Sequence, residues 1–146
     1  MKSNHVAFNP TLHVFKYQDR HDRISVQDKN AATTIGQLRD WVSLGGEVIF
    51  GTDIGAVDTD PAEEYAMMAE AGMSFPQILA SVTTTPAGRL GGPGESGKIE
   101  VGQMADLVAL NRDPSRNVRA LAGVAYTLRA GKVIYQAATR SDARNR

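Results

Sequence analysis

The chain has 146 residues, 42% of them hydrophobic and 22% charged, so it is long enough to bury the core of one ordinary soluble domain. Sixteen basic and sixteen acidic residues cancel without forming a run of like charge, so we expect neither nucleic acid nor a membrane as a partner. The absence of cysteine excludes disulfides and thiolate metal sites. The N-terminus has no signal-peptide stretch, so the default compartment is cytoplasmic, although a longer parent protein could carry an export signal upstream.

The first segments predict a strand followed by a loop. Residues 6–12 are apolar but are interrupted by Asn9 and Pro10, which suits a short strand that ends in a constrained loop. Residues 16–30 are polar and charged, with no period of either kind. We expect them to form a loop.

The next segments have the order of an α/β protein. Residues 31–44 place apolar side chains at helical intervals, and the Gly45–Gly46 pair that follows favours a helix end. Residues 47–50, Glu-Val-Ile-Phe, are rich in β-forming side chains and too few for a helix. A helix, a glycine turn and a strand in this order predict an α/β fold.

Two helix starts follow this strand. Asp60, Pro61 and Glu63 form a capping pattern, and Gly72 is placed to end the helix. Residues 74–77, Ser-Phe-Pro-Gln, repeat the pattern before a second apolar face. Residues 85–91 predict one more short helix.

The composition changes sharply at residues 91–94, Gly-Gly-Pro-Gly, where we expect a boundary. Beyond it, three runs of β type cover residues 105–110, 122–129 and 132–136. The last two are joined so tightly through Ala130 and Gly131 that they predict a hairpin.

Asp53 is the first candidate for chemistry. It directly follows the predicted strand at residues 47–50, and the carboxyl ends of buried parallel strands are where α/β barrels keep their active sites. A carboxylate there is explained by a bound metal or by proton transfer. The alternative is that Asp53 only caps the next loop by accepting backbone N–H groups.

Other polar residues are weaker candidates. His5, His13 and His21 stand eight residues apart, which is not a spacing of zinc ligands. His13 could reach the end of the first strand, but a surface or hydrogen-bonded role is the better interpretation. Asp58 and Asp60 are interpreted as turn and cap residues.

Several segments, taken in their order along the chain, resemble the amidohydrolase superfamily, and most closely its imidazolonepropionase-like and prolidase-like branch. They are residues 10–12 (PTL), 44–53 (LGGEVIFGTD), 85–91 (TPAGRLG), 97–114 (GKIEVGQMADLVALNRDP) and 130–136 (AGKVIYQ).

The resemblance implies the C-terminal part of a TIM (β/α)8 barrel, about its last two strands and helices, followed by part of a composite β-sandwich. The implied division is a barrel portion over residues 1–92, a sandwich segment over 93–138 and a disordered tail over 139–146. Residues 10–12 would lie on the seventh barrel strand, and Asp106 would be structural.

In this family the aspartate of the Gly-Thr-Asp sequence binds the metal and takes a proton from the attacking water, so the resemblance implies a catalytic and metal-binding role for Asp53. The expected cofactor is a divalent ion, commonly zinc, and the expected reaction is hydrolysis of a C–N bond in a small amide or dipeptide-like substrate. Homo-oligomerisation of the parent protein stays open.

The family's other metal ligands, a His-x-His, a lysine or glutamate and two histidines, have no counterpart in this sequence. We therefore expect a truncated product or a fragment that is inactive alone, because a catalytic zinc needs about three protein ligands. The alternative is a noncatalytic module that pairs with a partner chain supplying the rest of the barrel.

Overall fold

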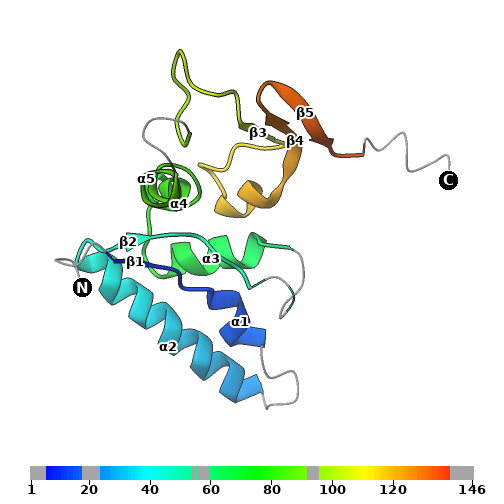
Figure 1. Ribbon diagram of the computed structural model, residues 1–146. Coiled ribbons are helices and arrows are strands. Elements are labelled where there is room, and N and C mark those ends of the chain that lie inside the picture. The colour runs from blue at the N-terminus through cyan, green and yellow to red at the C-terminus, as the bar shows by residue number, and fades with distance from the viewer. Residues whose placement is uncertain (1–5, 18–23, 54, 56–59, 92–95, 139–146) are drawn as a thin grey trace.

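The computed structural model describes residues 6–17, 24–53, 55, 60–91 and 96–138. Its elements run along the chain (Figure 1) as β1 (Ala7–Phe8), α1 (Leu12–Tyr17), α2 (Ile24–Ser43), β2 (Glu47–Val48), α3 (Ala62–Glu70), α4 (Phe75–Val82), α5 (Thr84–Leu90), β3 (Leu107–Leu110), the 3-10 helix η2 (Val118–Ala122), β4 (Val124–Arg129) and β5 (Lys132–Gln136). No helix among these described segments has the length and apolar character needed to cross a bilayer.

The first half is an α/β unit, as predicted. Strands β1 and β2 pair in parallel, with Phe8 opposite Val48, and the backbone N–H of Ile49 extends the pairing by donating to the Phe8 carbonyl at 2.9 Å. Helices α1 and α2 form the crossover between these strands, as parallel pairing requires. The glycine turn after α2 is confirmed, since Gly45 adopts a φ of 69°.

Two sequence predictions about this half are wrong. Residues 16–30 are not a loop throughout, because α1 reaches Tyr17 and α2 begins at Ile24. The start of α2 escaped detection because Lys29 and Asn30 are exposed, and an exposed turn of helix needs no apolar period. Residues 10–12 do not lie on a strand either, since β1 ends at Phe8 and Leu12 opens α1; Pro10 has no N–H to continue a ladder.

The helices after β2 begin close to the predicted positions, and α4 has the predicted capping box, but α3 begins one residue later than predicted, with Pro61 and not Asp60 at its N-cap. Asp60 accepts the backbone N–H of Ala62 at 2.9 Å at the start of α3. Gly72, with a φ of 92°, follows that helix. At α4, the Gln77 side chain accepts the backbone N–H of Ser74 at 2.8 Å. These local bonds satisfy backbone donors that have no partner within a helix.

The second half contains a three-stranded antiparallel sheet in the order β3-β4-β5. Ala130 and Gly131 join β4 to β5 with φ angles of 49° and 76°, the left-handed pair that a tight hairpin turn requires, so the predicted hairpin is confirmed. Asp106 accepts the backbone N–H of Ala130 at 2.7 Å. The carboxylate thus fastens this turn, which agrees with a structural role for Asp106.

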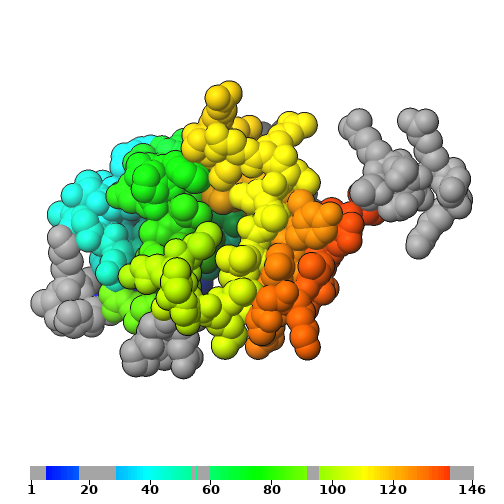
Figure 2. All heavy atoms as spheres, turned by 90° about the horizontal axis from the view of Figure 1, so that it is seen from above, coloured from blue at the N-terminus to red at the C-terminus, as the bar shows by residue number. Residues whose placement is uncertain are grey.

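The core lies around α3 and includes side chains of α1, α2, β2, α4 and η2. In Figure 1, α1 and α2 lie on one side of α3 and the β1–β2 pair, and α4 and α5 lie on the other side. Leu38, Met68 and Ile78 are fully buried there, and the Phe50 ring stacks on Tyr65 of α3 with centroids 4.4 Å apart. In the space-filling view, the segments from β3 to β5 gather on one side of the molecule, beside these helices (Figure 2). Because Phe50 follows β2 and stacks on Tyr65, this core supports the loop at the end of β2.

Candidate metal-ligand position and its supporting carboxylates

Strand β2 ends at Val48, two residues earlier than predicted, and Asp53 lies on the loop that follows, five residues beyond the strand. The backbone N–H of Phe50 does not bond to β1 but donates to the Ser81 carbonyl of α4 at 3.0 Å. This bond sets the direction in which the chain leaves the strand. Asp53 is exposed and adopts a φ of 54°. Because β1 and β2 are parallel, the loop after β1 leaves from the same edge of the pair.

The loops after β1 and β2 are in contact at Gly51. A Cβ atom added to Gly51 would lie 2.4 Å from Oδ1 of Asn9, so the Asn9 carboxamide occupies the space above this glycine. Each loop holds a non-glycine residue in the left-handed region, Thr11 with a φ of 43° and Asp53 with 54°. Such conformations persist where the surroundings impose them, and they cluster at functional sites.

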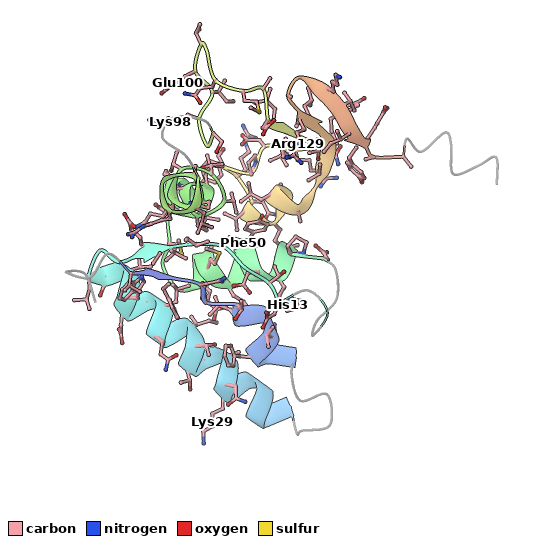
Figure 3. The ribbon with its side chains drawn as sticks, viewed as in Figure 1. His13, Lys29, Phe50, Lys98, Glu100 and Arg129 are labelled. Carbon is pink, nitrogen blue, oxygen red and sulfur yellow. The ribbon has the colours of Figure 1, made fainter. Side chains whose placement is uncertain are left out.

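The other residues singled out from sequence fall in different places. His13 is buried on α1, with 3% of its surface exposed (Figure 3), and Asp60, just before α3, accepts the backbone N–H of Ala62. His5, His21 and Asp58 lie outside the described residues. Over the parts of the chain that are described, the structure assembles no group of three or more histidine, aspartate or glutamate side chains able to hold a metal ion.

Glu64 on α3 is a buried carboxylate that sequence analysis missed. Its side chain is inaccessible to solvent, and its two oxygens accept the backbone N–H groups of Leu12 at 2.9 Å and His13 at 2.7 Å. Burial raises the pKa of this carboxyl, against the two backbone hydrogen bonds, which lower it. A signal existed, because Glu64 stands four residues before Met68 and seven before Ala71, on the apolar face of the helix.

The neighbouring Glu63 makes ion pairs on two sides. Its Oε1 accepts from Nζ of Lys16 on α1 at 2.8 Å, and its Oε2 accepts from Nη1 of Arg119 on η2 at 2.6 Å. The hydrogen bond from Lys16, followed by that from Arg119, lowers the pKa of Glu63. Consecutive carboxylates of α3 thus reach α1 and the 3-10 helix that precedes β4.

These residues do not by themselves fit a catalytic metal ion. Asp53 offers one exposed carboxylate, whereas a catalytic zinc takes about three protein ligands. Glu64 already gives both oxygens to backbone N–H groups. Any metal bound at Asp53 therefore needs ligands from beyond the described residues.

The parallel β1–β2 pair with its helices, followed by the antiparallel β3–β5 sheet, matches an α/β fold that occurs in larger solved hydrolase structures. A crystal structure of a Xaa-Pro dipeptidase with bound methionine is 24% identical, covers 94% of this chain with 36% of its own length, and gives a TM-score of 0.78. The A. niger ochratoxinase is 18% identical over 93% of this chain and 33% of its own, with a TM-score of 0.73.

A prolidase complexed with N-methylphosphonate-L-proline is 24% identical, over 78% of this chain and 29% of its own, with a TM-score of 0.63. The chain thus spans about a third of the length of each of these proteins. No curated protein matches the sequence. The model of the amidohydrolase family matches residues 5–135, and the chain therefore belongs to the amidohydrolase family.

Proposed function

We propose that this chain is the C-terminal portion of a metal-dependent amidohydrolase that hydrolyses a C–N bond, and that Asp53 is both a metal ligand and a catalytic residue. The observation that carries the proposal is the position of Asp53, an exposed carboxylate on the loop that leaves the carboxyl end of the parallel strand β2, five residues after Val48, in a chain of this family. Active sites of (β/α)8 barrels lie at the carboxyl ends of the strands.

In this proposal β1 and β2 are the last two strands of the barrel, and residues 1–92 form the barrel portion. In the same proposal residues 93–138 belong to a composite β-sandwich, and the tail expected over residues 139–146 lies outside the described residues. Asp53 would hold a divalent metal, zinc in our proposal, together with ligands from the rest of the barrel, and the bound metal would supply an activated water. The Asp53 carboxylate would accept a proton from that water.

The proposed substrate is a small amide or a dipeptide-like molecule. Support comes from the fold shared with a Xaa-Pro dipeptidase and with a prolidase that binds a proline phosphonate. The alternative of a noncatalytic module is not favoured, because the family match runs over most of the chain. We expect the chain by itself to be inactive, since Asp53 is the one metal ligand that this proposal assigns to its described residues.

A chimaera tests this proposal. The chain replaces the matching third of the Xaa-Pro dipeptidase, and hydrolysis of a Xaa-Pro dipeptide is measured with and without a chelator. We expect a chelator-sensitive activity that falls by about 10²–10⁴ in kcat in the Asp53→Asn variant, the range for loss of a general base. Asp40→Asn, an equal change at an exposed position on α2, is the control. A folded chimaera whose activity ignores Asp53→Asn would contradict the proposal.

A further inference from the structure

The buried carboxylate of α3 is connected to both loops at the carboxyl edge of the β1–β2 pair. Glu64 follows Asp53 along the chain, in the first helix after that loop. Its side chain turns back to the N-terminus of α1, where it accepts the N–H groups of Leu12 and His13. One residue therefore joins the segment after β2 to the segment after β1.

The second connection is made by Asn9, three residues before Leu12. Thr11 adopts its left-handed φ of 43° directly before the first N–H that Glu64 accepts. Two residues further back, the Asn9 side chain fills the space above Gly51. Asn9 thus links the segment before α1 to Gly51, which is two residues from Asp53, so a shift of the start of α1 would change this contact.

We propose that Glu64 is a positioning residue, which holds the loop after β1 against Gly51 and thereby sets the conformation of Asp53. The functional part of this inference rests on the proposed role of Asp53. Burial makes Glu64 suited to the task, because a carboxylate shielded from water holds its two N–H donors without competition from solvent. A shorter or neutral side chain would satisfy fewer of these donors.

Any test must distinguish the effect of Glu64 from the effects of the other charged groups near α3. On the elements that pack against α3, the described titratable and charged side chains are His13 and Lys16 on α1, Lys29, Arg39 and Asp40 on α2, and Arg119 on η2. On α3 itself they are Glu63, Tyr65 and Glu70. Glu63, with ion pairs to Lys16 and Arg119, is the neighbour that most needs a control.

The matched variants are Glu64→Gln and Glu63→Gln. Glutamine keeps the shape of Glu64 but replaces one acceptor oxygen with an NH2 group, which meets a backbone N–H donor with another donor. Glu63→Gln makes the same change one residue away and weakens two ion pairs. NMR spectra of the full 146-residue chain report the amide signals of Leu12, His13, Gly51 and Asp53 in each variant.

We expect Glu64→Gln to shift the amide signals at the start of α1 and also those of Gly51 and Asp53, and to speed hydrogen exchange at Leu12 or His13 by about tenfold or more. Glu63→Gln should leave all four signals in place. Movement at Leu12 and His13 without movement at Gly51 and Asp53 would show that Glu64 only caps α1, and would overturn the proposal.

If Glu64→Gln fails to fold, a pH titration of the unmutated chain followed by NMR gives a second test. The four amide signals should move together with the carboxyl carbon signal of Glu64. Random-coil positions of these signals, or their independence of that carboxyl group, would also overturn the proposal. Neither measurement uses metal or activity, so its failure is distinguishable from failure of the chimaera test of Asp53.

Discussion

The α/β region and the antiparallel sheet differ in how they are held together. In the α/β region, Leu38, Met68 and Ile78 are completely enclosed. In the antiparallel sheet, Val133, Ile134 and Tyr135 of β5 keep between 51% and 63% of their surfaces exposed. Leu121 of η2 is the one buried apolar residue described after residue 96. Side-chain burial therefore stabilises the first region, and the second depends on its strand pairing and its turn.

A strand or helix can therefore be well defined without contributing much to the core. Strands β4 and β5 are rich in β-forming residues and are joined by a tight turn, and their pairing contains a register shift between Thr127 and Leu128. Yet few of their side chains are removed from water, which is the source of most folding free energy. Substitutions of the same kind should therefore have unequal effects in the two regions.

The largest effect is expected for a pair of isoleucines. Ile78→Ala removes a fully buried side chain and should lower the free energy of unfolding by about 2–5 kcal/mol, the range for such cavities. Ile134→Ala, at a side chain that is 63% exposed, should lower it by about 1 kcal/mol or less. Urea unfolding followed by circular dichroism measures both. Equal losses would refute the contrast between the regions.

A smaller but still clear contrast is expected for the two glutamates of α3. Glu64→Ala leaves the buried N–H groups of Leu12 and His13 without their acceptor, at about 1–3 kcal/mol for each group that stays unsatisfied. Glu63→Ala removes ion pairs that are partly exposed, worth about 1 kcal/mol or less. The same unfolding measurement applies. A larger loss for Glu63→Ala would contradict the greater contribution assigned to the hydrogen bonds of Glu64.

The smallest effect is a difference in pH dependence between the same residues. The pKa of Glu64 is raised by burial, so its contribution to stability is full below its ordinary value of 4.5 and is lost as pH rises through the folded-state value. The pKa of Glu63 is lowered by Lys16 and Arg119, so its contribution is present above 4.5 and is lost as pH falls.

The unfolding free energies of the unmutated chain, Glu64→Gln and Glu63→Gln on both sides of pH 4.5 check these signs. Relative to Glu64→Gln, the unmutated chain should lose stability as pH rises. Relative to Glu63→Gln it should gain stability, by an amount that salt reduces because the ion pairs are partly exposed. Slopes of the same sign for both variants would contradict the assigned causes.

Much of the fold was predictable because its signals are local. Asp60, the pair Ser74 and Gln77, and the turn at Ala130 and Gly131 each act through neighbours in sequence. The position of Asp53 after a strand was predictable for the same reason. The start of α2 was not, because its exposed residues give no apolar period.

Contacts between residues that are distant in sequence were the main feature that could not be predicted. Glu64 meets Leu12 across 52 positions of sequence, and Asn9 meets Gly51 across the parallel pair. Neither contact leaves a local pattern beyond the carboxylate on the apolar face of α3. The conformations of the loops near Asp53 therefore depend on tertiary packing, which could not be predicted from a single sequence.

The metal content of the dipeptidase chimaera tests the central claim most directly. Chimaeras with Asp53, with Asp53→Asn and with the control Asp40→Asn are dialysed against buffered zinc, and bound metal is measured by mass spectrometry together with folding by circular dichroism. The account predicts that Asp53→Asn weakens zinc binding by at least about tenfold, since each ligand of a catalytic site is one of about three, while Asp40→Asn binds normally. Equal zinc binding by the two folded variants would contradict it.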